Sequence, residues 1–126
     1  MPDPADTFFA AAREGTLLIQ RCDRCGVHQF TLPGLSAGVE RCRACTASHP
    51  RWVPAAGTGT IATYTVVHGR DRGPRTVAGL VELDEGPWVP ARIEAEPERV
   101  RVGQPVVVAF AEGEDAARPV PVFVPG

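Results

Sequence analysis

The sequence contains no lysine, and aromatic residues are scarce. All 13 basic residues of the 126-residue chain are arginine, the formal net charge is −2, and there are five Phe, two Trp and one Tyr. Proteins that bind nucleic acid usually present a strong positive field, and single strands stack on aromatic side chains. An anionic membrane also demands positive charge. We therefore expect neither nucleic acid nor a membrane as a partner.

Long apolar runs are absent as well. The longest, such as Val106 to Ala111, are far shorter than the roughly 20 residues that cross a bilayer. The N-terminus, Met1 to Asp6, is acidic where a secretory signal would be basic, and no apolar segment follows it. These features predict a protein without a transmembrane segment, and we expect it to be cytoplasmic.

The common catalytic motifs are missing too. The chain has two serines and no GxSxG, HExxH or Gly-rich phosphate loop. His68 is followed by a loop with arginines up to Arg75, which could hold an anion such as a phosphate, although a solvated loop is the simpler interpretation. We expect no catalytic residue in this chain.

Two further groups of side chains have alternative interpretations. Glu82, Asp84 and Glu85 could form a carboxylate cluster, but charges beside a hairpin turn usually serve solubility. Trp52 and Trp88 are expected in the core or at an interface rather than as platforms for nucleic acid bases.

Glycine and proline, in contrast, are abundant, with 13 of each. They predict many turns and short strands, and they make an all-α bundle unlikely. One short helix is predicted over residues 4–14, because Asp3 can cap its start and Gly15 follows its end. Its Phe8 and Phe9 form an apolar side that must pack on this chain's own core or on a partner.

The pattern of the remaining chain is that of β-structure. Five runs rich in Val and Thr follow residue 57, and five strands in about 70 residues suit an OB-fold. These runs are Thr58–His68, Thr76–Asp84, Trp88–Ala95, Gln104–Glu112 and Val120–Val124. Three shorter extended pieces are expected before them, at Thr16–Gln20, Val27–Leu32 and Arg51–Pro54.

The four cysteines are the most specific feature of the sequence. Cys22 and Cys25 form one CxxC motif, Cys42 and Cys45 form another, and the spacing matches a zinc ribbon with two knuckles. Each CxxC turn directs two thiolates at one point, and four thiolates around a tetrahedral metal leave no open position. We therefore predict that these residues bind structural zinc, or iron in a rubredoxin-like version.

Other interpretations of the cysteines are two disulfides, a thioredoxin-like redox pair, or a site that has lost its metal. Disulfides are not favoured, because the sequence shows no export signal. The redox motif belongs to a βαβ pattern that the sequence does not show. His28 and His49 lie near the knuckles and could replace a cysteine. With four cysteines present, we expect both to be solvated or supporting groups.

Several motifs follow one another in an order that is more specific than the cysteines alone. They are Phe8-Phe9, Cys22-Asp23-Arg24-Cys25-Gly26, Cys42 to Cys45, Trp52, Gly57 to Thr60, Tyr64 to His68, Val81 to Gly86, and Pro121 to Phe123. Together they resemble the acyl-CoA-associated OB-fold proteins with a rubredoxin-like zinc ribbon, known as the domain of unknown function thirty-five family. Residues 32–40 depart from the Pro- and aromatic-rich segment of that family.

The resemblance implies a fold and a function. The fold is mainly β, with an N-terminal helix (residues 1–15), a rubredoxin-like zinc ribbon (16–56) and a five-stranded OB-fold barrel (57–126). The function implied is a non-catalytic subunit or domain that binds a thiolase-like enzyme, in a heterotetramer or larger complex. The partner would be a thiolase, an acyltransferase or a steroid side-chain aldolase, and acyl-CoA would be its ligand. No motif assigns the residues that contact acyl-CoA.

Two other functions remain to be weighed. Zinc ribbons joined to OB-folds are common in nucleic-acid-binding modules, but the absence of lysine and the net charge of −2 count against this alternative. A free-standing enzyme that uses the loop from Arg70 to Arg75 would need a polar constellation that the sequence does not show.

Overall fold

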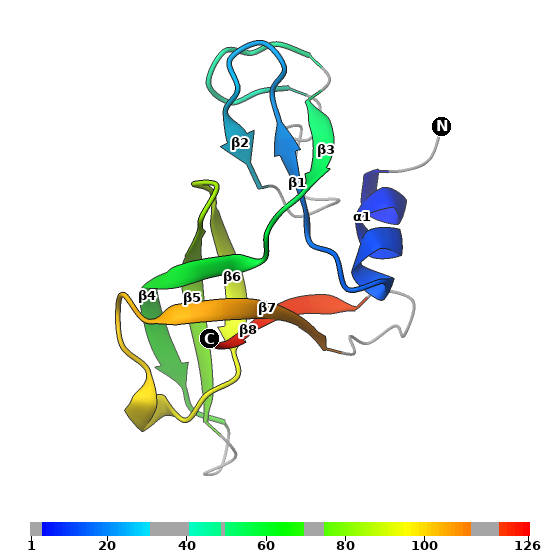
Figure 1. Cartoon of the computed structure of the whole chain (residues 1–126). Helices are drawn as coiled ribbons and strands as arrows, with labels where there is room; N and C mark the ends of the chain where they lie inside the picture. Colours follow the sequence, from blue (N-terminus) through cyan, green and yellow to red (C-terminus); the bar gives the residue numbers. More distant parts are fainter. Residues whose placement is uncertain (1–3, 31–40, 49, 70–74, 112–118) are drawn as a thin grey trace.

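The computed structural model describes residues 4–30, 41–48, 50–69, 75–111 and 119–126. Within these residues it has one α-helix, α1 (Pro4–Arg13), a three-stranded sheet and a closed five-stranded barrel. Figure 1 shows the small sheet at one end of the barrel, with α1 beside it. The predicted fold class, mainly β with a short N-terminal helix, a ribbon and a barrel, is confirmed.

Helix α1 packs on the chain's own core. Phe8 is 1% exposed, and its ring lies edge-on to Phe9 with the centroids 5.2 Å apart. The same ring contacts Phe30 and Trp52, with centroid distances of 6.2 and 6.3 Å. Of the two surfaces considered for this helix, Phe8 therefore uses the internal one, and it is not available to a partner.

The strands of the small sheet flank the two cysteine motifs in the sequence. Its strands are β1 (Leu18–Arg21), β2 (His28–Gln29) and β3 (Arg51–Pro54), all antiparallel, with β1 in the middle. Strand β2 is shorter than the predicted piece, part of which lies outside the described residues. Ile19 on β1 is fully buried and joins one continuous core with α1 and the barrel.

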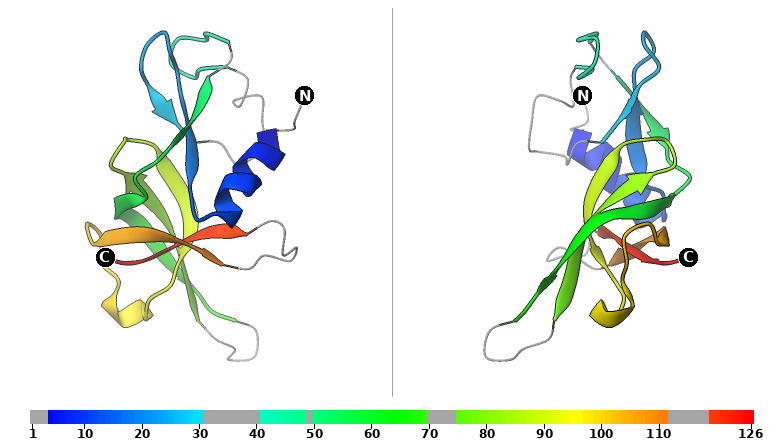
Figure 2. Two further views of the ribbon diagram at one scale, coloured as in Figure 1. Left: turned by 45° about the vertical axis from the view of Figure 1, so that its right-hand side comes forward. Right: turned by 90° about the vertical axis from the view of Figure 1, so that its left-hand side faces the viewer.

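The barrel is built from the five predicted runs. Its strands are β4 (Thr58–Val67), β5 (Thr76–Leu83), β6 (Trp88–Ile93), β7 (Pro105–Ala111) and β8 (Val120–Pro125), closed in the order β4-β5-β6-β8-β7. A 3₁₀ turn, η3 (Pro97–Arg99), lies between β6 and β7. Figure 2 shows the barrel and the ribbon sheet from two further sides. In the described part of the chain, no helix has the length and apolar character of a membrane span.

Residues 55–57 connect the small sheet to the barrel, and each of them forms a hydrogen bond with a different part of the fold. The N–H of Ala55 donates to the carbonyl of Leu17 at 2.9 Å, and the N–H of Ala56 donates to a carboxylate oxygen of Glu85 at 2.8 Å. The carbonyl of Gly57 accepts from the N–H of Val108 at 2.7 Å. Three successive residues are thus bonded to three different parts of the fold, which fixes the ribbon on the barrel.

Gly57 allows a close approach that no other residue permits. Its φ is +84°, and a Cβ added there would lie 2.7 Å from Cγ1 of Val108. We expect Gly57→Ala to lower the free energy of unfolding by about 2 kcal/mol more than Gly103→Ala, measured by urea denaturation. Gly103 is the matched control, because its φ is +86° and nothing lies within 4 Å of an added Cβ.

Equal losses for the two variants would contradict this explanation. If the contact with Val108 is the cause, Val108→Ala should restore part of the stability in the Gly57→Ala background, and the double-mutant cycle measures that coupling.

Candidate metal centre

The two CxxC motifs form turns with the same hydrogen bonds. In the first, the N–H of Gly26 donates to the carbonyl of Cys22 at 2.8 Å, and the N–H of Cys22 donates to Val27 at 3.0 Å. The second repeats both bonds, from Thr46 to Cys42 at 3.0 Å and from Cys42 to Ala47 at 2.9 Å. The turns are therefore two copies of one knuckle.

The repeat identifies a feature that the sequence analysis missed. The fifth residue of the first knuckle is Gly26, with a φ of 77°, and its counterpart in the second knuckle is Thr46, with a φ of 61°. A β-branched residue rarely adopts this left-handed conformation. The knuckle geometry therefore holds Thr46 in a strained backbone, and aligning the two CxxC motifs would have pointed to this position.

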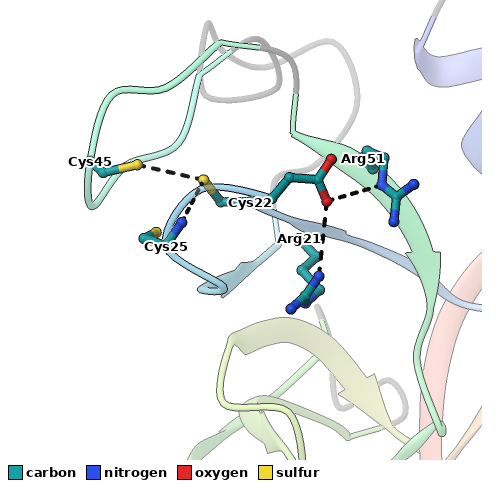
Figure 3. A network of polar contacts seen from close by, with 6 residues as sticks. Arg21, Cys22, Cys25, Cys45 and Arg51 are labelled. Carbon is teal, nitrogen blue, oxygen red and sulfur yellow. Dashed lines mark hydrogen bonds and ion pairs between the residues drawn. The ribbon is translucent and has the colours of Figure 1, made fainter.

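The four sulfurs converge. Sγ of Cys22 lies 3.5 Å from Sγ of Cys45, Sγ of Cys25 lies 3.6 Å from Sγ of Cys42, and all four lie within 4.8 Å of one another. Figure 3 shows Cys45 facing Cys22 from the second knuckle, with Cys25 close by in the first. A disulfide has sulfurs about 2.0 Å apart, and the four cysteines are free, so the disulfide alternative is not supported.

Backbone N–H groups and neighbouring sulfurs shift the pKa values of these thiols. The N–H of Cys25, 3.5 Å from Sγ of Cys22, is the main reason that the pKa of Cys22 is lowered to about 6. The N–H of Cys45 similarly lowers the pKa of Cys42. For Cys25 the N–H of Val27 also favours the thiolate, but desolvation and the three neighbouring sulfurs outweigh it and raise the pKa to about 12.

This donor set fits a thiophilic divalent cation. Sulfurs at about 2.3 Å from a tetrahedral zinc lie about 3.8 Å from one another, which agrees with the spacing found here. Four sulfurs this close repel one another once several are ionised, and a central cation would remove that repulsion. His28 is half-buried and does not belong to the converging group, and His49 lies outside the described residues.

A buried amide supports the second knuckle. Gln29, on β2, accepts from the N–H of Arg43 at 3.0 Å and donates to the carbonyl of Arg41 at 3.3 Å, so it binds on both sides of Cys42. It also donates to the side chain of Gln20 at 3.3 Å, and both amides are buried. The sequence contains no signal for this role of Gln29, because its partners Arg41 and Arg43 lie in a separate turn.

An ion-pair network lies beside the cysteines. Oδ1 of Asp23 is 3.1 Å from Nε of Arg51 and 3.9 Å from Nη1 of Arg21. Figure 3 shows Arg21 and Arg51 beside the first knuckle, with dashed lines for the ion pairs. All three side chains are well exposed, so the pairs add little stability. Their effect is local: they connect the first knuckle to β3.

The other candidate residues occupy different places. His68 is exposed at the end of β4, residues 70–74 lie outside the described part, and Arg75 forms an ion pair with Glu98 that lowers the pKa of this carboxyl. Most of the loop from His68 to Arg75, considered above as an anion site, therefore lies outside the described residues.

The three hairpin carboxylates are more than surface charges. Glu82 accepts from Nε1 of Trp88 at 3.1 Å, Asp84 accepts from the hydroxyl of Thr58, and Glu85 accepts from Ala56. Trp52 packs against the core, as expected, whereas Trp88 is 51% exposed and lies outside it.

Comparison with known proteins defines the class. Residues 52–111 match the C-terminal OB-fold domain of ChsH2, and residues 9–31 match its rubredoxin-like zinc ribbon domain. The solved structure of an "Ltp2-ChsH2(DUF35) aldolase" is similar over 99% of this chain and 96% of that chain, with 30% identity and a TM-score of 0.77. The class is thus a zinc ribbon joined to an OB-fold. The chain belongs to the DUF35 family, as its motifs predicted.

Two more relatives extend the comparison. A DUF35 protein of unknown function from Sulfolobus solfataricus has the same fold, with 14% identity and a TM-score of 0.69 over 98% of this chain and 86% of that chain. A "Probable enoyl-CoA hydratase alpha subunit" of Thermomonospora curvata is 35% identical over 94% of this chain and 36% of its own length. The chain thus spans about a third of this curated relative.

Replacing one cysteine should remove the metal and unfold the ribbon. We expect Cys22→Ser to lose nearly all bound metal, measured by inductively coupled plasma mass spectrometry, because a closed four-ligand site tolerates no missing ligand. His28→Ala is the control and should keep the metal. A Cys22→Ser protein that stays metal-free, folded and partner-bound would contradict a structural role.

The buried amide gives a second prediction. Gln29→Leu should speed metal transfer to a chelator by about tenfold, because outer partners that orient a ligand turn typically change affinity by that order. Gln104→Leu makes the same substitution in the turn before β7, where the side chain accepts from the N–H of Arg101, and should leave the transfer rate unchanged. Equal rates for Gln29→Leu and the native protein would show that Gln29 does not support the site.

Proposed function

We propose that this chain is a non-catalytic accessory subunit or domain that binds a thiolase-like enzyme and assists acyl-CoA binding and assembly of the complex. The observation that carries the proposal is the likeness to the Ltp2-ChsH2 aldolase structure, which extends over nearly all of both chains. The relative from T. curvata is itself described as a hydratase subunit. The names of the two relatives are thus those of an aldolase and of a hydratase subunit.

The local chemistry supports an accessory role. The four thiols, the best nucleophiles of the chain, converge on one point, and a tetrahedral metal would occupy all of them. We propose zinc as this metal, held by Cys22, Cys25, Cys42 and Cys45, with iron as the alternative. Bound metal would supply folding energy to a module too small to bury a core of its own, rather than activate water.

Two finer features belong to the same proposal. We divide the chain into the helix (residues 1–15), the ribbon (16–56) and the OB-fold (57–126). The hydrogen-bonded connection at residues 55–57 lies at the boundary between ribbon and OB-fold. We propose that the partner is an aldolase, a thiolase or an acyltransferase of the thiolase superfamily, and that the complex is a heterotetramer or larger.

Affinity capture tests the proposal. The tagged chain is purified from extracts of its own cells, and bound proteins are identified by mass spectrometry, with an unrelated tagged OB-fold protein as the control. We expect a thiolase-like protein in near-stoichiometric amount, and acyl-CoA turnover by the purified complex but not by this chain alone. Recovery of nucleic acid and its usual binding proteins instead would overturn the proposal in favour of a nucleic-acid-binding module.

A further inference from the structure

The two cysteine knuckles have the same hydrogen bonds but not the same backbone strain. Gly26 and Thr46 occupy equivalent places, and each N–H donates to the carbonyl of the first cysteine of its knuckle, at 2.8 and 3.0 Å. Their φ angles are 77° and 61°. Glycine adopts this left-handed conformation freely, whereas a β-branched residue is strained in it. The turn is therefore relaxed in the first knuckle and strained in the second.

The chain that leads into and out of each knuckle differs as well. The arms of the first knuckle continue into β1 and β2, which pair with each other, and β1 also pairs with β3. The arms of the second knuckle meet in one isolated bridge, between Arg41 and Ser48. Among the described residues, the first knuckle thus extends from a sheet, whereas the arms of the second are joined by a single residue pair.

Within the second knuckle, the first cysteine is held more firmly than the second. Cys42 is 2% exposed, and the buried amide of Gln29 binds the backbone on both sides of it. Cys45 is only half-buried, and Thr46 is exposed. The carbonyl of Thr46 accepts from the guanidinium of Arg41, but at 3.4 Å and open to water this bond is weak. The strained residue therefore directly follows the less buried cysteine of its knuckle.

We propose that the turn at Cys45 and Thr46 is the part of the metal centre that opens first, and that the strain at Thr46 sets how readily metal enters and leaves. The first knuckle, the sheet and the core stay folded during this local opening, which requires less free energy than unfolding of the whole domain. Strained residues are concentrated where a structure changes between two states. The inference rests on the proposed metal, and it adds the order in which the centre opens and the residue that controls this step.

Amide hydrogen exchange of the zinc-loaded chain, measured by NMR, tests the order of opening. The N–H groups of Gly26 and Thr46 make equivalent hydrogen bonds, so their protection can be compared once intrinsic rates are corrected. Protection of Thr46 should be about tenfold lower than that of Gly26. Gly26→Thr should lower the protection at position 26 to that of Thr46. A Cβ there has its nearest contact at 3.8 Å, with Nη2 of Arg21, so it introduces strain without a clash.

Equal protection of Gly26 and Thr46 in the native chain would overturn the proposal. Stronger protection of Thr46 would overturn it as well, and is the result expected if exposure of the thiols decides the order, because Cys25 in the first knuckle is more exposed than Cys45.

Zinc transfer to a chromogenic chelator in excess tests the role of Thr46 itself. Thr46→Gly removes the strain and should slow the transfer about tenfold. Thr46→Ala removes the hydroxyl, which donates to the carbonyl of Cys45 at 2.6 Å, but keeps a Cβ in the left-handed conformation. It should stay within about threefold of the native rate. Ala44→Gly adds a glycine to the same turn at a residue without a positive φ, and should not slow the transfer.

The outcomes separate this inference from the proposed metal. If Thr46→Gly transfers zinc at the native rate, or if Thr46→Ala slows transfer as much as Thr46→Gly, backbone strain does not control the opening and the inference is wrong. The proposed metal stands in either case. If the native chain binds no zinc, the proposed metal fails, and this inference fails with it. Metal content and circular dichroism confirm that each variant is folded.

Discussion

The meeting of four sulfur atoms at one point is the constraint on which the ribbon depends. Its three strands have four, two and four residues, too few to bury a separate core. The buried Ile19 and Phe30 belong instead to a core shared with α1 and the barrel. The ribbon is thus closed at one end by the knuckles and at the other by packing on its neighbours. Without the cysteine knuckles, or without the packing on α1 and the barrel, the short strands of the ribbon would not be stable.

Hydrogen bonds at residues 55–57 join the ribbon to the barrel. Ala55, Ala56 and Gly57 are bonded in turn to Leu17, directly before β1, to the β5–β6 hairpin and to β7. A ribbon held in this way presents a surface together with the barrel, in keeping with the proposed role in binding and assembly. The β5–β6 hairpin takes part in this connection through Glu85.

The elements and the convergence of the cysteines were predictable because their causes are local. Val- and Thr-rich runs between turn residues correspond to the barrel strands, Gly15 follows the helix, and each CxxC turn sets the direction of its own thiols. The destination of Phe8 was left open, since an apolar helix face does not reveal what it packs on. The supporting amide of Gln29 was missed because its partners Arg41 and Arg43 lie in the second knuckle, in a separate part of the chain.

The sequence by itself determined the class of the protein: the two cysteine pairs, their spacing and the ordered motifs were enough to identify the family. Only the tertiary structure decided which polar side chains form hydrogen bonds within the fold. Glu82, Asp84 and Glu85 looked like ordinary charges beside a turn, yet each bonds a separate part of the fold. For Trp88 the sequence left the core and an interface open, and its 51% exposure excludes the core, so the interface stays a prediction. The physical reason is that strand and turn formation depends on neighbours in the chain, whereas hydrogen-bond partners and exposure depend on which distant segments the fold brings together.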